Sequence, residues 1–317
     1  MLSRYADVSA ALRDMRLCAA SGRVQGAGGA VDEIAHSQFR ELAQAEFSAA
    51  RVAEWRAEIT PRADRMFRGL ALNRTVELLS EFAEPWSLAV AVTVTGADPL
   101  QVERLNPLAR DVFMAASEPF DRGLQASAAR ATTELMGSFS SALYVQAFVA
   151  LSQTLPCFLS GAWLALLQDP AAALELRANP ELMPKAVEEL LRYATPSRAQ
   201  FRRARCAVNI NGTKIDAGQR VVLMLAAANR DPEEFPEPDR LDWSRTRVNH
   251  VAFGAGPHAC VGAALVRTAA AVATKAFLDY FGETELTDAI VWSGGSSIRW
   301  PVSLRVAHRP SQRSMAR

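Results

Sequence analysis

Cysteine is scarce in this chain of 317 residues, and neither sign of charge is in excess. The four cysteines, Cys18, Cys157, Cys206 and Cys260, form no CxxC pair. This spacing disfavours a zinc site, and a scaffold held by disulfides is not expected at this length. We therefore expect a reducing, cytoplasmic compartment. The 35 basic and 34 acidic residues leave a formal net charge of +1, so no bulk field indicates nucleic acid or a membrane as a partner.

Long uninterrupted apolar runs are also missing. Residues 1–17 contain no apolar segment of the kind found in signal peptides. The most apolar stretch, residues 142–167, is interrupted by Ser152, Gln153 and Pro156, which predicts a buried central helix and not a membrane span. No GxGxxG fingerprint is present, so a flavin or nicotinamide domain within this chain is not expected.

Half of the residues are nonetheless apolar, which is enough to bury a large core. Helical periodicity interrupted by Gly and Pro predicts helices over the first two thirds, and short alternating segments predict strands after them. These patterns predict a single, mainly α domain over residues 1–317 with small β-sheets, and we expect a monomer. Helices are expected over 8–15, 37–45, 52–71, 76–82, 99–117, 141–168, 184–193 and 260–279, and strands over 206–210, 213–215, 221–223 and as a pair near 291–306.

The most informative segment is the loop Phe253-Gly-Ala-Gly-Pro-His-Ala-Cys-Val-Gly262. Gly254 and Gly256 allow tight or left-handed turns and a close approach of the backbone to a flat ligand. Cys260 follows at the expected start of a helix, where free N–H groups and the helix dipole favour a thiolate. The alternative is a glycine-rich turn before a helix with an inert, buried cysteine. The spacing alone does not decide between these two interpretations.

The pattern Phe-Gly-x-Gly-x-His-x-Cys-x-Gly resembles the haem-binding loop of the cytochrome P450 family. The resemblance implies that Cys260 is the axial thiolate of haem b iron, in a loop shaped by Phe253, Gly254, Gly256 and Gly262. An axial thiolate donates electron density to iron. The resemblance extends from Tyr5 to Val306, and it implies the P450 fold.

Two later segments fall in the order of that family. Glu189-Leu-Leu-Arg192 resembles its ExxR motif, and i and i+3 side chains share one helix face. Pro238-Asp-Arg240 resembles the following meander, which implies that Arg240 joins Glu189 and Arg192 in a buried ion network beneath the cysteine loop. Taken alone, Glu189 and Arg192 would be an ordinary surface pair.

Four basic residues match the positions that bind the haem propionates in the family. His36 and Arg40, four residues apart, resemble its HxxxR motif and project from one helix face, where they can bind a carboxylate together. Arg202 and His258 complete the expected set. Each of them singly would be an ordinary surface residue.

The oxygen-activating helix departs from the family pattern. Aligned on that pattern, Ala150-Leu-Ser-Gln-Thr154 keeps the threonine as Thr154 but has Gln153 at the acid and Leu151 at the usual glycine. An amide can orient water but cannot supply a proton as a carboxyl group does. Because Pro156 has no N–H, we expect a break in the helix that frees the carbonyl of Ser152.

The chain is short for the family. The segment that begins at Tyr5 matches a helix that normally follows two strands and another helix, so the resemblance implies a fold without those elements. The stretch 16–36 is compressed, which would shrink the lid over the distal pocket, and 118–142 is also shorter than usual. These departures leave open a decayed or non-catalytic haem-binding homologue.

The leading hypothesis is a haem-thiolate monooxygenase that oxidises an apolar small molecule. Thr154 would assist the bound oxygen and Gln153 would orient water. Substrate contacts are expected from 146–151, 197–201 and 296–298, and electrons from an external ferredoxin or flavodoxin reductase system. A peroxide-using or non-hydroxylating haem-thiolate enzyme is the alternative, because the relay acid is missing. Arginines that could contact a redox partner, although each is more simply a solvated helix charge, are Arg62, Arg65, Arg68 and Arg267.

Overall fold

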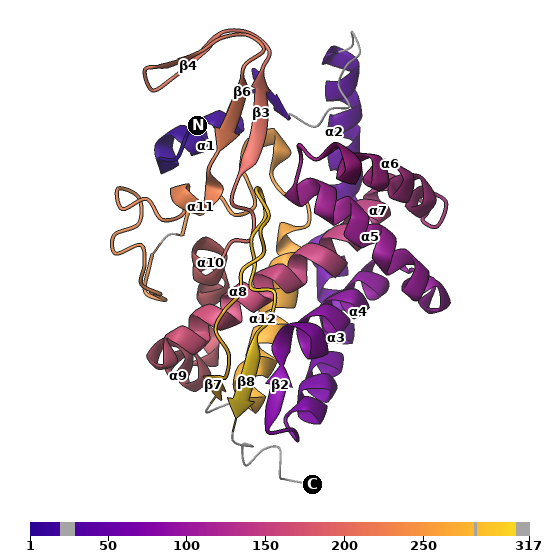
Figure 1. The fold of residues 1–317 in the computed structure, drawn as a ribbon, viewed down its shortest axis with the longest axis vertical. Coiled ribbons are helices and arrows are strands. Elements are labelled where there is room, and N and C mark those ends of the chain that lie inside the picture. The colour runs from indigo at the N-terminus through magenta and orange to yellow at the C-terminus, as the bar shows by residue number, and fades with distance from the viewer. Residues whose placement is uncertain (20–28, 247, 282–283, 309–317) are drawn as a thin grey trace.

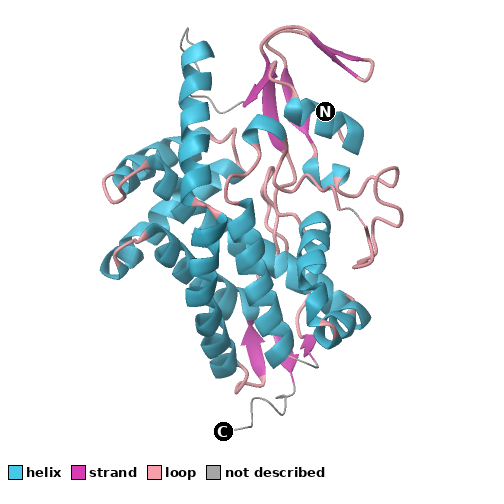
Figure 2. Cartoon of the chain, turned by 180° about the vertical axis from the view of Figure 1, so that it is seen from behind, coloured by secondary structure: helices cyan, strands magenta, loops and turns pink. Residues whose placement is uncertain are grey.

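The computed structural model describes residues 1–19, 29–246, 248–281 and 284–308, with the side chains of residues 19 and 29–36 left out. The described part is mainly helical, with small antiparallel sheets, as the sequence predicts (Figures 1 and 2). The helices are α1 (Tyr5–Arg13), α2 (Gly29–Glu46), α3 (Ala49–Leu70), α4 (Glu84–Thr95), α5 (Val102–Ser117), α6 (Arg122–Met136), α7 (Ala142–Val149), α8 (Leu155–Gln168), α9 (Pro170–Ala178), α10 (Met183–Tyr193), α11 (Leu225–Ala228) and α12 (Ala263–Tyr280).

The described residues form three small sheets, two of which join strands far apart in the chain. One has the order β1 (Leu17–Ala19), β3 (Gln200–Ala204), β6 (Arg220–Leu223). A second has the order β2 (Thr75–Glu77), β8 (Arg305–His308), β7 (Thr284–Leu286), and it lies at the end of the molecule nearest the C-terminus (Figure 1). The third is the hairpin of β4 (Val208–Ile210) and β5 (Thr213–Ile215). All of these pairings are antiparallel.

Two expected elements differ from the structure because their partners are distant in sequence. The helix predicted over 76–82 is instead the strand β2 followed by the π-helical turn η1 (Leu79–Ala83), since β2 pairs with β8. The strand pair expected near 291–306 is reduced to an isolated bridge between Trp292 and Pro301, and β8 pairs with β2 and β7. Between β4 and β5 the chain turns at Asn211-Gly212, whose φ angles are 46° and 85°.

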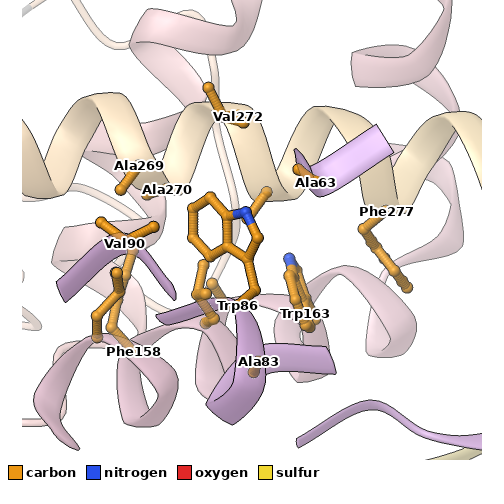
Figure 3. Packing of buried hydrophobic residues seen from close by; sticks show 14 of the residues in the cluster. Ala63, Ala83, Trp86, Val90, Phe158, Trp163, Ala269, Ala270, Val272 and Phe277 are labelled. Atoms are coloured by element: carbon orange, nitrogen blue, oxygen red, sulfur yellow. The ribbon is translucent and has the colours of Figure 1, made fainter. Parts of the chain in front are cut away.

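The apolar stretch in the middle of the chain forms one long helical rod, α7, the π-helical turn η3 (Ala150–Thr154) and α8. By length and hydropathy this rod could cross a membrane, but 67% of its most apolar window is buried within the fold. Trp163 on α8 is fully buried, stacks on Phe277 of α12 at 5.3 Å between centroids, and donates its indole N–H to Thr274. Figure 3 shows Trp163 beside Trp86 of α4 in this core. The rod is therefore the central core helix that the sequence predicts.

Proline determines where two helices open into π-helical turns. In η3 the N–H of Leu155 donates to Ala150 five residues back, and Pro156 follows directly. In η1 the N–H of Glu84 donates to Leu79 five residues back, and Pro85 follows directly. Because proline has no N–H to continue the regular ladder, the wider turn ends at each site. The break expected at Pro156 is present in this form.

A fully buried ion pair joins α10 to the irregular segment 229–245. Glu189 and Arg192 form two hydrogen bonds of 2.8 Å, and neither side chain is exposed. Arg192 also donates to the backbone carbonyls of Asn229 and Pro238. A buried guanidinium is tolerated only when its donors are filled in this way, so the pair fixes the path of the segment that precedes the cysteine loop.

The third member of this network is Arg245 and not Arg240. Arg245 donates to Glu189 at 3.0 Å and its side chain is 9% exposed, whereas the Arg240 side chain is 61% exposed and pairs with Glu237. Arg240 contributes only its backbone carbonyl, which accepts from Arg192 at 3.2 Å. The expectation for Arg240 was wrong, because the turn of the segment points its side chain outward and brings in a residue five positions later.

We predict that Arg245→Met lowers the free energy of unfolding by about 2–3 kcal/mol, the usual value of a hydrogen bond to a buried charge. The matched variant Arg240→Met changes the free energy of unfolding by less than about 0.5 kcal/mol, as expected of a surface site. Urea denaturation followed by circular dichroism measures both. Equal effects of the two substitutions would contradict the assignment.

Candidate functional site

In the sequence, the cysteine loop lies between the irregular segment 229–245 and α12. The 3₁₀ turn η5 (Gly256–His258) precedes Cys260, and the N–H of Cys260 donates to the carbonyl of Phe253 at 2.8 Å. Helix α12 has Gly262 as its N-cap, so the cysteine stands two residues before the cap. This geometry closes the loop into a rigid ring and leaves the Cys260 side chain exposed.

Both glycines of the loop have left-handed backbone angles, as their place in the sequence predicts. Gly254 has φ of 68° and Gly256 has φ of 69°. A Cβ at Gly256 would also lie 2.9 Å from both the Cα of Arg13 and the carbonyl oxygen of Leu12, whereas at Gly254 the nearest atoms are 3.7 Å away. Gly256 is therefore required for conformation and for packing against α1, and Gly254 for conformation alone.

Cys260 opens into a cavity of about 460 Å³ between the loop, α2 and the first half of the central rod. The wall opposite the cysteine comes from α7 and η3 and is apolar except for Gln146. Lining residues are Phe39, Arg40, Phe47, Leu143, Gln146, Ala147, Ala150, Leu151, His258, Ala259, Cys260, Val261, Gly262, Leu265 and Val266. A thiol facing an apolar space is the arrangement that a flat, apolar cofactor with an axial sulfur ligand requires.

The surroundings of the sulfur act on its ionisation in opposite directions. The pKa of the Cys260 thiol is raised, because desolvation by the surrounding walls, although the side chain is accessible, outweighs the lowering by the Gly262 N–H and by the charges of Arg267 and Arg40. Arg40 is held in place because its guanidinium donates to the carbonyl of Ala259 at 2.7 Å. Arg40 on α2 and Arg267 on α12 thus place two positive charges beside the loop, and each charge acts in favour of the thiolate form.

The four predicted propionate ligands differ in their position relative to the cavity. His258 lines the cavity beside Arg40, and His36 lies on α2 four residues before Arg40 with its side chain outside the described part. Arg202 on β3 is 5% exposed and does not line the cavity. Its guanidinium donates to Phe201 and to Gln200, and among the described residues its Nε has no acceptor.

The environment of Arg202 fits an anion that none of the described residues provides. Burial lowers the pKa of this guanidinium, which means that its charge is poorly compensated. Gln200, which accepts from Arg202, lies within 3.7 Å of the position a Cβ would take at Gly254 in the cysteine loop. A carboxylate entering beside the loop would fill the free donor, and this is the demand that a haem propionate meets.

The two predicted oxygen-side residues lie away from the cavity. Gln153 is buried and lines a separate groove of about 460 Å³ between α4, α5 and α8, where its amide donates to Asn106 at 2.6 Å. Thr154 is half-buried and lines neither space among the described pockets. Ala150 and Leu151, in the turn before them, do line the cavity. The expectation that Gln153 faces the ligand is therefore corrected, because the helix directs its side chain toward α5.

Of the three expected substrate segments, 146–151 lines the cysteine cavity, whereas 197–201 and 296–298 lie next to each other and do not line it. Ser197 and Ile298 form an antiparallel bridge. The hydroxyl of Ser297 donates to the carbonyl of Ser117 at 2.8 Å, which fixes this segment to the end of α5.

One buried residue was not recognised from the sequence. Asn229 is fully buried, and its side-chain oxygen accepts from the N–H of Val251 at 2.8 Å while its carbonyl accepts from Arg192. It thus couples the ion network to the start of the cysteine loop. An asparagine before a charged turn is a common surface pattern, so no local signal distinguishes it.

The three loop glycines yield a graded prediction. Gly256→Ala should be the most destabilising, because the left-handed angle alone costs about 1–2 kcal/mol and the contact with α1 adds to it. Gly254→Ala should cost only the conformational part of about 1–2 kcal/mol. Gly262→Ala, where φ is −88° and no atom lies within 4 Å of the added Cβ, should be nearly neutral. Thermal unfolding measures the series, and any other order contradicts the loop geometry.

Comparison with known proteins agrees with this geometry. The family model described as Cytochrome P450 matches residues 167–288. Cytochrome P450 107B1 of Saccharopolyspora erythraea is 30% identical, over 96% of this chain and 86% of the relative. The biotin biosynthesis cytochrome P450 of Bacillus subtilis is 28% identical, over 80% of this chain and 72% of the relative.

Solved structures of this kind have the same fold. P450BioI, in complex with hexadec-9Z-enoic acid ligated acyl carrier protein, superposes with a TM-score of 0.88 at 24% identity, over 97% of this chain and 92% of that one. CYP109B1 from Bacillus subtilis superposes with a TM-score of 0.84 at 24% identity, over 96% and 92%. With the cysteine loop, the buried ion pair and the 30% identity over nearly the whole chain, the conclusion is that this chain belongs to the cytochrome P450 family, and is an oxidoreductase of that type with haem as its cofactor.

Proposed function

We propose that this chain is a haem-thiolate monooxygenase that binds haem b through Cys260 and oxidises an apolar small molecule. The observation that supports it most is the exposed sulfur of Cys260 facing an apolar cavity, together with the buried guanidinium of Arg202, whose Nε has no acceptor among the described residues. Relatives at similar identity are named as oxygenases, among them 6-deoxyerythronolide B hydroxylase at 28% identity. Haem, when bound, supplies the oxygen-activating chemistry.

The protein's own residues would bind and orient that group. Cys260 ligates the iron, with its negative charge stabilised by the Gly262 N–H and by Arg40 and Arg267. His36, Arg40, Arg202 and His258 hold the propionates, and Gly254 permits the close approach of the backbone. The apolar wall with Ala150 and Leu151 excludes water from the face opposite the sulfur.

The remaining features of the proposal concern the oxygen side and the partners. Thr154, which follows the cavity-lining Ala150 and Leu151 in η3, would support proton handling on the oxygen side, whereas Gln153 is held by Asn106 outside the cavity. The substrate is apolar, because most of the cavity wall is aliphatic or aromatic. Electrons come from an external ferredoxin or flavodoxin reductase system. We further propose that residues 1–317 act as one cytoplasmic domain, monomeric, with neither a membrane nor a nucleic acid as partner.

The placement of Gln153 favours a second candidate, a peroxide-using or non-hydroxylating enzyme. Its amide is engaged with Asn106 and Ser152 and cannot titrate near neutral pH. Hydrogen peroxide already carries the protons that molecular oxygen would need from a relay acid. The loss of that acid therefore lowers activity less with peroxide than with oxygen. Product formation with peroxide and no reductase supports this candidate, whereas strict dependence on oxygen and a reductase supports the first. A haem-loaded protein inactive under both conditions would be a non-catalytic homologue.

The ligand assignment is tested by the carbon monoxide difference spectrum of the reduced protein. Wild type should show the Soret band of a thiolate ligand, and Cys260→Ala should abolish it because no other sulfur of the described residues lines the cavity. Cys206→Ala, at an exposed cysteine elsewhere, is the control and should retain the band. A band that survives Cys260→Ala would refute the proposal.

The propionate role of Arg202 is tested by separating haem affinity from stability. Arg202→Met should weaken haem binding about tenfold to a hundredfold, the value of a charge-assisted hydrogen bond of about 1.5–3 kcal/mol. The free energy of unfolding of the haem-free protein should change by less than about 1 kcal/mol, since the lost hydrogen bonds are offset by removing a poorly compensated buried charge. Haem titration and urea denaturation measure the two quantities.

The control is Arg203→Met, which removes an exposed cation from the adjacent position of the same strand. It should leave haem affinity unchanged. If Arg203→Met and Arg202→Met weaken haem binding equally, the effect is one of overall charge and Arg202 has no special role.

A further inference from the structure

Phe253 is enclosed by two basic side chains. The guanidinium of Arg267 on α12 lies 4.8 Å from the centre of its ring, and the His250 ring lies 5.8 Å away at 57°. The carbonyl of Phe253 accepts the N–H of Cys260. The contacts that position the Phe253 side chain therefore also position the backbone of Cys260.

A single carboxylate on α10 binds both basic groups. Glu188 accepts from Nε of Arg267 at 2.5 Å and from Nη2 at 2.9 Å, a bidentate geometry. The Nε2 of His250 lies 3.3 Å from the same carboxylate. Burial would raise the pKa of Glu188, but the hydrogen bonds and charges of His250 and Arg267 outweigh it and hold the pKa at about 2. Glu188 is thus ionised near neutral pH.

His250 is fixed by the start of the loop. Its side chain is 3% exposed, and its Nδ1 accepts the N–H of Ala252 at 3.3 Å. With Nδ1 engaged in this way, Nε2 is the ring nitrogen on the side of Glu188. Glu188, next to Glu189 of the buried ion network, is thus connected through His250 to the backbone just before the loop.

The charge of Arg267 lies close to the residue that carries the sulfur. The guanidinium is paired with Glu188 and stacked on Phe253, and the carbonyl of Phe253 accepts the N–H of Cys260. Without its carboxylate partner, Arg267 would act on the sulfur as a full positive charge, and a full charge withdraws more electron density from a donor than a neutralised one.

We propose that Glu188 is a positioning residue that holds Arg267 against the Phe253 ring and neutralises its charge, and that the pair thereby sets the electron-donating strength of Cys260. The inference rests on the proposed haem ligation by Cys260. It assigns to Glu188 and Arg267 a function distinct from that of Glu189 and Arg192, which hold the backbone. Because Glu188 and Arg267 are partly exposed, at 28% and 40%, the effect is moderate and screened by salt.

The test is the midpoint reduction potential of the haem-loaded protein in four forms: wild type, Glu188→Gln, Arg267→Gln and the double variant. Glu188→Gln should favour the reduced state at least threefold, which is about 28 mV at about 59 mV per tenfold for one electron. Arg267→Gln should shift the potential the opposite way. The double variant should return to within about twofold, or about 18 mV, of wild type, because no unpaired charge remains.

Two matched variants separate charge from packing. Arg267→Lys keeps the charge but loses the flat stacking group, and its potential should stay within about twofold of wild type. Glu181 is an exposed acid in a surface groove that Glu188 and Arg267 also line. Glu181→Gln should leave the potential unchanged.

Several results would overturn the inference. It fails if Glu188→Gln leaves the potential unchanged, if the double variant shifts as far as Glu188→Gln alone, or if Arg267→Lys shifts as far as Arg267→Gln. In all of these cases the thiolate spectrum of wild type remains, so the proposed function stands. A wild-type protein without that spectrum overturns the proposed function, and this inference with it.

Discussion

A fully buried ion pair supports the irregular part of this fold. Segment 229–245 contains little regular structure, so its backbone carbonyls need donors from elsewhere. Arg192 provides them. The carboxylate of Glu189 compensates the charges of both Arg192 and Arg245. Such a pair is weak evidence for stability, because desolvation offsets most of its Coulomb energy. Its value here is geometric, since through Asn229 it fixes the residue that begins the cysteine loop.

Above that support, the loop is held by contacts of three different kinds. Gly256 allows close packing on α1, the Phe253 carbonyl ties the Cys260 N–H, and Arg40 binds the carbonyl of Ala259. Each contact removes a degree of freedom from the sulfur before any ligand binds. A ligand atom positioned in advance costs less ordering entropy on binding, which is the physical advantage of so constrained a loop.

The oxygen side is built differently from the sulfur side. Two π-helical turns, each followed by a proline, lie in helices that pack together, and the groove beside them holds Gln153 with Asn106. The amide of Gln153, at the position where the family pattern has an acid, thus forms a side-chain hydrogen bond with Asn106 of α5. The cysteine loop keeps the family's sequence pattern, whereas Gln153 stands where that pattern has an acid.

The sequence by itself determined the mainly helical class, the central apolar helix, the break at Pro156 and the cysteine loop with its left-handed glycines, because these follow from local periodicity and from residues that restrict or free the backbone. Only the tertiary structure decided that β2 is a strand, that Arg245 and not Arg240 joins the ion pair, that Gln153 faces α5, and that Glu188 binds Arg267. Each of these depends on a partner distant in sequence, and the direction of a side chain toward such a partner is set by how whole elements pack and not by neighbouring residues.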